Sequence, residues 1–158
     1  MSTNTTTAED RLAALGIHLP EAPAPFGAYV PAVQTGNLLF LSGMLATKGH
    51  KAAIVGVVGK DVDGEAGREA AHMAALNALA LIKKQLGSLN RVSRVVRLGV
   101  YIAATPESTE HVTIADAASE LFRDVLGEDT ISSRLVIGVA SLPLGSPVEL
   151  EVVLEVKP

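Results

Sequence analysis

Apolar residues recur at helical spacing in two long stretches of this chain. Over residues 64–86, large apolar side chains return every three or four positions on an alanine-rich body, which is the period of an amphipathic helix. Gly87 follows this stretch and fits a left-handed helix end. A second helix is predicted over residues 109–126, where Gly127 closes the pattern. The large residues that recur in the first helix are Met73, Leu76, Leu79, Ile82 and Leu86.

Shorter apolar runs, rich in β-branched residues, predict strands. The first two runs flank a turn at Gly36, and the last two flank a turn that contains Pro143 and Pro147, so each pair is predicted to form a hairpin. The order β-β-β-α-β-α-β-β predicts an α+β fold in which both helices pack on one face of a mixed sheet. The runs cover residues 29–34, 37–42, 53–58, 92–103, 134–140 and 148–156.

The N-terminal part of the chain differs from the rest. Residues 1–7 are rich in Ser, Thr and Asn and are expected to be disordered. A short helix is predicted over residues 8–15, and a proline-rich connector over residues 20–25. A chain of this length is most simply one domain. We therefore predict an N-terminal extension over residues 1–25 and a single domain over residues 26–158.

Composition indicates a core built from aliphatic side chains. Of the 158 residues, 48% are hydrophobic but only 3% are aromatic, and tryptophan is absent. A small chain this apolar fits an obligate oligomer that hides part of its surface. The net charge is −4 and the sequence has no basic run, which argues against nucleic-acid binding because that function needs positive charge and stacking aromatics.

Other residue types exclude further classes of site. The chain has no cysteine, so it has no disulfide, no thiolate nucleophile and no cysteine metal site. Its four histidines are scattered without metal-ligand spacing, so we expect no metal. The N-terminus lacks a signal-peptide pattern, and no apolar run is long enough to span a membrane. These features predict a soluble cytoplasmic protein without a membrane partner.

One arginine lies at the start of an otherwise apolar predicted strand. If that strand is regular, Arg134 and Val136 share a face of small residues, and the alternate residues fill the core. The guanidinium fits a carboxylate through two parallel hydrogen bonds, and burying it unpaired would be costly. Arg134 therefore either binds the carboxylate of a ligand or forms an ion pair with Glu149, Glu151 or Glu155. The alternate residues are Leu135, Ile137 and Val139.

The segment that follows Arg134 resembles the RidA/YjgF family of reactive-intermediate deaminases. The specific part of the resemblance is the spacing from Arg134 to Leu142-Pro143 and on to Val148-Glu149-Leu150-Glu151. Gly27-Ala28-Tyr29 and Leu41-Ser42-Gly43-Met44 are similar to two shorter family segments. The resemblance runs from about Phe26 to the end of the chain. It implies a chorismate-mutase-like fold, assembled as a homotrimer with ligand sites between subunits.

The resemblance also implies a reaction and a set of site residues. Small 2-imino or enamine acids would be hydrolysed to 2-oxo acids and ammonia, without a metal or cofactor. Arg134 would anchor the substrate carboxylate, and Glu149 would position or activate water. The remaining substrate-binding residues would be Tyr29, Ser42, Gly43, Asp116 and Val136.

The same residues also allow structural interpretations. Glu149 could belong to a solvated polar face, and Tyr29 could be an amphipathic core residue. In the predicted final hairpin, Glu149 would face Gly138, roughly 13 Å from Arg134 at the usual rise per residue. The two could then meet only across a subunit boundary or through a β-bulge.

Three positions depart from the family pattern. Asp116 stands where the family usually has asparagine, and a carboxylate there would repel a substrate carboxylate; otherwise Asp116 is a helix-surface residue. Val136 stands where many relatives have cysteine, and Met44 where many have glutamine. These departures keep open a second possibility. The chain would then be a non-catalytic trimeric protein of the same fold, with a regulatory role or a role in binding small carboxylates. Endoribonuclease activity is disfavoured by the acidity of the chain and its few aromatic residues.

Overall fold

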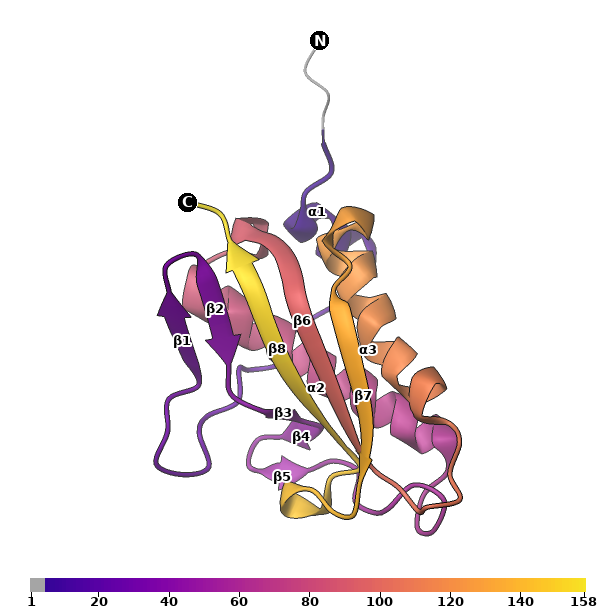
Figure 1. Ribbon diagram of the computed structural model, residues 1–158. Helices are drawn as coiled ribbons and strands as arrows, with labels where there is room; N and C mark the ends of the chain where they lie inside the picture. The colour runs from indigo at the N-terminus through magenta and orange to yellow at the C-terminus, as the bar shows by residue number, and fades with distance from the viewer. Residues whose placement is uncertain (1–4) are drawn as a thin grey trace.

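The computed structural model describes residues 5–158, which form a mixed sheet with helices on one of its faces (Figure 1). The long helices α2 (Gly64–Leu86) and α3 (His111–Leu126) lie side by side behind the sheet. The short helix α1 (Ala8–Ala14) packs against α3. The predicted α+β arrangement, with both long helices on one face of a mixed sheet, is confirmed.

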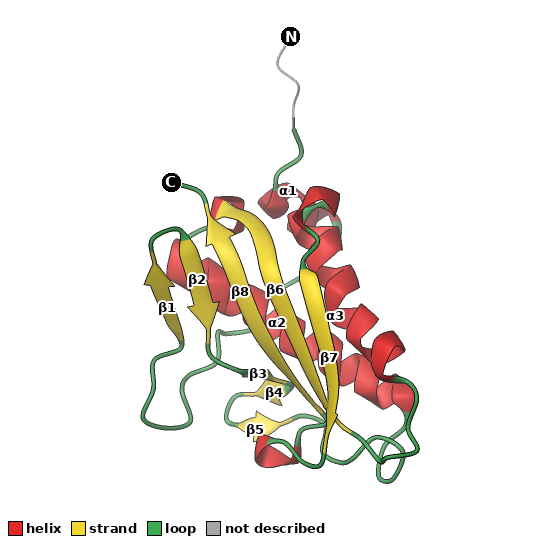
Figure 2. Cartoon of the chain, in the orientation of Figure 1, coloured by secondary structure: helices red, strands yellow, loops and turns green. Residues whose placement is uncertain are grey.

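The main sheet has the strand order β1-β2-β8-β6-β7 (Figure 2). Strand β3 pairs with the same edge of β8 as β2 does, but nearer the start of β8. A separate small ribbon joins β4 and β5. Short 3-10 helices occupy three turns: η1 (Leu89–Arg91), η2 (Glu128–Thr130) and η3 (Pro143–Gly145). The strands are β1 (Ala32–Thr35), β2 (Leu38–Leu41), β3 (Met44–Leu45), β4 (Thr47–Lys48), β5 (Lys51–Ala52), β6 (Val92–Ala103), β7 (Ser133–Val139) and β8 (Val148–Val156).

The predicted final hairpin is wrong. Strand β7 pairs in parallel with β6, and β8 pairs antiparallel with the other side of β6. Helix α3 is therefore the crossover of a strand–helix–strand unit, which favours parallel neighbours. Strand β8 lies in the centre of the sheet, between β2 and β6. This position suits its apolar side chains, since Leu150, Val152 and Leu154 face the helices and are completely buried. The expected pairing of Glu149 with Gly138 is also wrong.

The two faces of β7 are the reverse of the prediction. Arg134 lies opposite Leu98 of β6, which is fully buried beneath the helices, so Arg134 and Val136 face the helical layer. Leu135 and Ile137, expected in the core, are instead 42% and 40% exposed on the face without helices, which we call the open face. Alternation along a strand defines two faces, but it does not say which of them a helix covers.

Helix α2 is held at both ends by the residues expected of a helix boundary. The Asp63 carboxylate accepts a hydrogen bond from the Ala66 N–H at 2.9 Å, and Gly87 adopts the left-handed conformation with φ 82°. Its most deeply buried side is lined by small residues, which let it lie close to the sheet and α3. Leu79 and Ile82 are buried with them. The small residues are Ala70, Ala71, Ala74, Ala75 and Ala78.

The third predicted strand, over residues 53–58, is also wrong. The chain there forms bends and turns, and the nearby strand β5 ends before it. Gly56 and Gly59 have φ values of 136° and 90°, which an extended strand does not allow. Val58 is nevertheless fully buried, and its N–H donates to the Ala103 carbonyl at 2.8 Å. The apolar run therefore marks a loop that is anchored by one buried residue, Val58, while Val55 is exposed.

Helix α1 joins the N-terminal segment to the rest of the fold. Thr7 caps it, and its hydroxyl accepts a hydrogen bond from the Asp10 N–H at 3.2 Å. The Arg11 guanidinium donates to the last carbonyls of α3, Val125 at 2.8 Å and Leu126 at 2.6 Å. The expected disorder of residues 1–7 lies largely outside the described residues.

Candidate functional site

A pocket of about 440 Å³ lies where the start of β8 meets β3, the loop before β1 and the turn after β7. It holds four of the predicted site residues: Tyr29, Ser42, Gly43 and Glu149. We call it the Glu149 pocket. Its other lining residues are Phe26, Leu45, Pro143 and Leu144. Sequence reasoning did not select these apolar residues, although Pro143 belongs to the matched motif.

Glu149 is the ionisable group of this pocket. In the sheet register it lies between Tyr101 of β6 and Leu45 of β3, on the open face. Its carboxylate forms no hydrogen bond or ion pair with any group in residues 5–158, and burial raises its pKa above the ordinary value. A half-buried carboxylate with a raised pKa is a better proton acceptor than an exposed one, and it can return the proton in a later step.

Gly43 makes room for that carboxylate. A methyl group added at Gly43 would overlap Oε1 of Glu149. The Glu149 side chain therefore rests against bare backbone, and any side chain at residue 43 would displace it. Gly43 of the matched segment has a steric role here that the sequence pattern alone did not reveal.

The two hydroxyl groups of the pocket are used differently. The Ser42 hydroxyl donates to the Val30 carbonyl at 2.6 Å, so it holds the loop before β1. The Tyr29 hydroxyl accepts a hydrogen bond from the Phe26 N–H at 2.9 Å, which leaves its own proton free for a ligand. Tyr29 was expected in a strand, but it lies in the loop that precedes β1 and is 47% exposed.

Arg134 lies on edge strand β7 and forms a cluster with helix α3. Its Nη1 atom donates to Oδ1 of Asp116 at 2.7 Å and to Oγ of Ser119 at 3.1 Å. We call these three residues the Arg134 cluster. Val136 lies next to it on the same strand face. An ion pair was one of the expected alternatives, but the partner is Asp116 and not a glutamate of β8.

The structure does not bring the two groups of site residues together within one chain. Strand β6 separates β7 from β8, and Arg134 faces the helical layer while Glu149 faces the open side. Ser119 was missed in the sequence. Its only signal is its position three residues after Asp116, which places both on one helix face.

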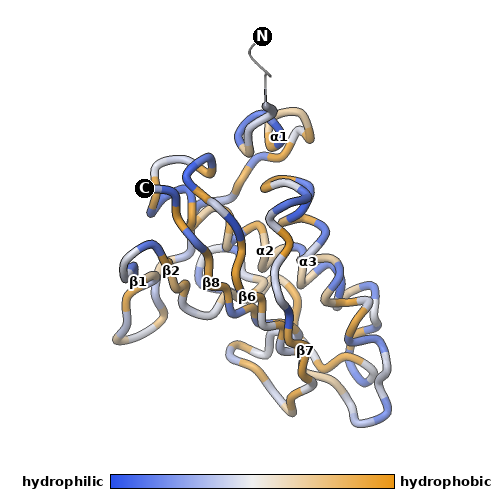
Figure 3. The backbone as a smooth tube through the Cα atoms, turned by 45° about the horizontal axis from the view of Figure 1, so that its top comes forward, coloured by the Kyte–Doolittle hydropathy of each residue, from blue (hydrophilic) through white to orange (hydrophobic). Residues whose placement is uncertain are grey.

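The open face carries an apolar margin around a polar centre. Hydrophilic and hydrophobic residues interchange along β6 and β8 (Figure 3). In the centre, the Tyr101 hydroxyl donates to Glu151 at 2.9 Å, and this hydrogen bond raises the pKa of Tyr101. Arg97 lies 3.7 Å from the same carboxylate. The exposed apolar residues around it are Val33, Phe40, Leu135 and Ile137.

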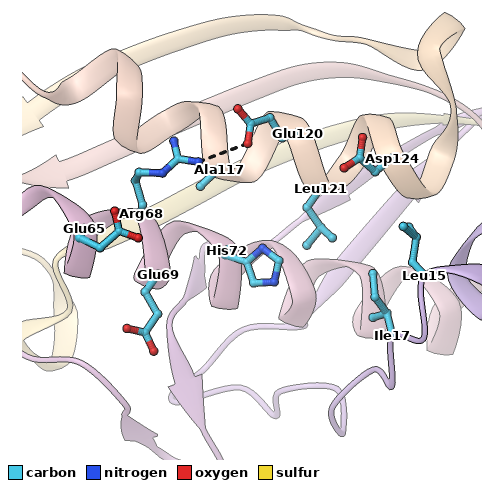
Figure 4. A pocket seen from close by; sticks show the side chains of 10 residues that line it. All are labelled: Leu15, Ile17, Glu65, Arg68, Glu69, His72, Ala117, Glu120, Leu121 and Asp124. Atoms are coloured by element: carbon cyan, nitrogen blue, oxygen red, sulfur yellow. Dashed lines mark hydrogen bonds and ion pairs between the residues drawn. The ribbon is translucent and has the colours of Figure 1, made fainter.

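A groove of about 520 Å³ runs between α2 and α3 on the helical side (Figure 4). Acidic and apolar residues line it in equal number, and the ion pair between Arg68 and Glu120, at 3.2 Å, bridges the two helices. It contains none of the predicted site residues. In the part of the chain that the structure describes, no set of three or more His, Asp or Glu side chains could hold a metal ion. No helix in that part is long and apolar enough to cross a membrane.

A family model described as "YjgF/chorismate mutase-like, putative endoribonuclease" matches residues 9–156. The match begins in α1, upstream of the segment that carries the sequence resemblance. It therefore covers both the Glu149 pocket and the Arg134 cluster.

Individual proteins show the same likeness. Protein TCP17 of Trypanosoma cruzi is 37% identical over 142 residues, which cover 89% of this chain and 89% of that protein. A 2-iminobutanoate/2-iminopropanoate deaminase of Dermatophagoides farinae is 29% identical over 136 residues, 85% of this chain and 91% of that protein. The crystal structure of a "putative endoribonuclease" from Shewanella oneidensis is 32% identical with a TM-score of 0.90, and covers 95% of this chain and 99% of that one. The resemblance and the chorismate-mutase-like fold are confirmed.

Proposed function

We propose that this chain, which belongs to the YjgF/chorismate mutase-like family, hydrolyses small 2-imino or enamine acids to 2-oxo acids and ammonia. The observation that carries the proposal is the Glu149 pocket, in which a carboxylate with a raised pKa, unpaired within the described residues, lies among apolar residues. A relative that is named as a 2-iminobutanoate/2-iminopropanoate deaminase supports the same chemistry.

Each group has a defined task in the proposed reaction. Arg134 binds the substrate carboxylate and so fixes the C=N carbon near Glu149. Glu149 takes a proton from water as the oxygen adds to that carbon. The same carboxyl gives the proton to nitrogen, which yields a carbinolamine. Glu149 then transfers the hydroxyl proton of the carbinolamine to nitrogen as the C–N bond breaks, and the products are the 2-oxo acid and ammonia. The free hydroxyl proton of Tyr29 can hydrogen-bond the substrate.

The walls of the pocket favour a substrate with an apolar side chain. Phe26, Leu45 and Leu144 surround the carboxyl of Glu149 and offer no charged partner to a polar side chain. The imino acids of alanine, 2-aminobutyrate and leucine fit this environment better than those of charged amino acids. The imine is already electrophilic, so positioning and one acid–base group suffice for its hydrolysis.

We further propose that the site forms between subunits of a cyclic homotrimer. Arg134 and Glu149 face opposite sides of one sheet, so they can act on one substrate only if they come from different chains. Strand β7 is a sheet edge, and the open face beside it exposes Leu135 and Ile137. Association between subunits commonly buries both an edge strand and an exposed apolar face. Light scattering should give about three times 16.3 kDa.

Subunit complementation tests the reaction and the shared site together. Arg134→Ala and Glu149→Gln chains should each be inactive as homotrimers in an assay of ammonia release from freshly generated imino acids. In every mixed trimer, one junction joins an intact Arg134 to an intact Glu149. Random co-assembly should therefore restore about a quarter of wild-type activity, because three-quarters of the trimers are mixed and each has one active junction in three.

The control for this test places both substitutions in one chain. Co-assembly of that chain with Arg134→Ala should restore nothing. Failure of the two single variants to complement would place both groups in one subunit and would contradict the interfacial site.

A second function is favoured by one observation. Asp116 neutralises the charge of Arg134, which suits binding of a carboxylate without strong catalysis. A wild-type trimer that binds 2-oxo acids but releases no ammonia from imino acids would establish this non-catalytic alternative in place of the deaminase.

A further inference from the structure

We propose that Asp116 and Ser119 are positioning residues that present one edge of Arg134 to the ligand and make the site selective for carboxylates over inorganic anions. The inference rests on the proposed role of Arg134 as the anchor for a substrate carboxylate. It assigns a task to Asp116 that differs from the simple repulsion expected from the sequence.

The hydrogen bonds of Arg134 leave a defined part of the guanidinium free. The Nη1 atom carries two hydrogens, and its two acceptors are Oδ1 of Asp116 and Oγ of Ser119. Within residues 5–158, no group bonds the Nε or Nη2 atoms. The Nε–Nη2 edge offers two parallel N–H groups, which is the arrangement that fits both oxygens of a carboxylate.

Helix α3 makes this arrangement rigid. Asp116 and Ser119 lie one turn apart on the same helix face, so they hold Nη1 from two directions. Their neighbours Ala115 and Ala118 are completely buried, which ties this part of α3 to the core. The free edge of Arg134 therefore keeps its orientation without a ligand, and binding loses less side-chain entropy.

The charge of Asp116 supplies the selectivity. It cancels the charge of Arg134, so an anion gains little from net attraction and must gain from hydrogen-bond geometry. A planar carboxylate can accept both N–H groups of the free edge. Inorganic phosphate would gain more from an uncompensated positive charge. Removing the charge of Asp116 should therefore help phosphate more than it helps a carboxylate.

The test compares the binding of 2-oxobutanoate and of inorganic phosphate by calorimetry, on the intact full-length protein. In Asp116→Asn the side-chain oxygen still accepts from Nη1 but the charge is gone, so phosphate affinity should rise about 10-fold with little change for 2-oxobutanoate. In Asp116→Ala, phosphate affinity should rise similarly and 2-oxobutanoate affinity should fall about 10-fold because the orientation is lost. Ser119→Ala should weaken 2-oxobutanoate binding about 3-fold.

A matched control is available on the same helix. Asp124→Asn changes the net charge equally, but Asp124 pairs with Arg123 at 2.9 Å and does not touch Arg134. Its ratio of phosphate to 2-oxobutanoate affinity should equal that of the wild type. A ratio in both Asp116 variants within about 2-fold of wild type would overturn the proposal, and so would a wild type that binds neither anion.

The binding test and the test of the proposed reaction can fail independently, because binding is measured without turnover. A wild-type protein that shows the anion selectivity but releases no ammonia would support the positioning role and contradict the reaction. Conversely, a wild type that releases ammonia while the Asp116 variants keep its anion selectivity retains the reaction and overturns the positioning role. In an active protein, Asp116→Ala should also raise KM more than it lowers kcat, and Asp116→Asn should restore KM.

Discussion

The Glu149 pocket and the Arg134 cluster differ in how they treat a charged side chain. Glu149 is a carboxylate without a partner in the described chain, placed among apolar residues that raise its pKa. Arg134 is a cation whose charge is already compensated by Asp116, on a strand supported by a rigid helix. Burial destabilises the charged form of the first group. The second is well stabilised, and only one edge of it remains available.

Neither region alone contains both groups that the proposed reaction needs. A proton-transfer group benefits from desolvation, which shifts its pKa toward the working range. An anchor benefits from pre-orientation, which its partners in the same chain provide. Because the two lie on opposite faces of one sheet, the proposed trimer would bring together two groups that are each already placed by their own chain.

Loss of the anchor should have the largest effect on activity and a small one on stability. Arg134→Ala should lower kcat/KM for imino-acid hydrolysis by about 10³-fold, since it removes a charged bidentate contact to the substrate. The ion pair with Asp116 is partly exposed, so the free energy of unfolding should fall by no more than about 1 kcal/mol. Ammonia release and chemical unfolding measure both.

Arg134→Lys is the matched variant, because it keeps the charge but loses the fork. It should remain strongly impaired. Full turnover in Arg134→Ala would remove the anchor role. An unfolded Arg134→Ala protein would instead show that the ion pair is structural, and the contrast between the two regions would disappear.

Loss of the proton-transfer group should change activity and stability in opposite directions. Glu149→Gln should lower kcat by about 10²-fold with little change in KM, because its task concerns water. The raised pKa means that the folded chain holds this proton where the unfolded chain has released it. The free energy of unfolding contributed by Glu149 therefore falls as the pH rises above the ordinary glutamate pKa.

Glu149→Gln should accordingly melt at a higher temperature than wild type at pH 7, and the advantage should shrink as the pH is lowered through the pKa of Glu149 in the folded chain. The acidic limb of the wild-type pH–kcat profile should lie above the ordinary glutamate range for the same reason. A variant that melts lower than wild type at pH 7 would show that Glu149 has a stabilising partner in the assembled protein.

A methyl group at residue 43 should disturb the pocket without touching the anchor. Gly43→Ala would push the Glu149 carboxylate from its place, and that flexible group can move without unfolding the chain. We expect a loss of about 10-fold in kcat with an unchanged melting temperature. Gly27→Ala is a suitable control, because its methyl group would meet only the Tyr29 ring at 3.7 Å. Equal activities of the two variants would contradict the steric role of Gly43.

The sequence predicted what depends on local pattern and missed what depends on pairing between distant segments. Helix 64–86 and its end at Gly87 follow from spacing and one glycine, and both are present. The partner of β7 depends on how α3 crosses over the sheet, and a turn containing Pro143 suggested a hairpin instead. The family resemblance predicted Arg134 and Glu149 as site residues, which stays a prediction, and no pattern in the sequence indicated that they face opposite sides of the sheet.

The smallest predicted effect concerns the rim of the Glu149 pocket. Leu144 has φ 60°, a left-handed conformation that costs a non-glycine residue about 1 kcal/mol, and its side chain is 46% exposed at the pocket edge. Leu144→Gly removes both the strain and the apolar wall. Stability should change by less than about 1 kcal/mol, because relief of strain is offset by the greater freedom of glycine in the unfolded chain. The preference in kcat/KM for the imino acid of leucine over that of alanine should fall about 3-fold.

Leu144→Asn distinguishes the loss of the apolar pocket wall from the relief of backbone strain. Asparagine tolerates the left-handed conformation but presents a polar side chain. It should lose the same preference as Leu144→Gly. An unchanged preference in both variants would show that the side chain of the substrate points away from Leu144. The apolar setting of Glu149 would then serve only to raise its pKa, and the two halves of the site would differ in electrostatics and not in substrate recognition.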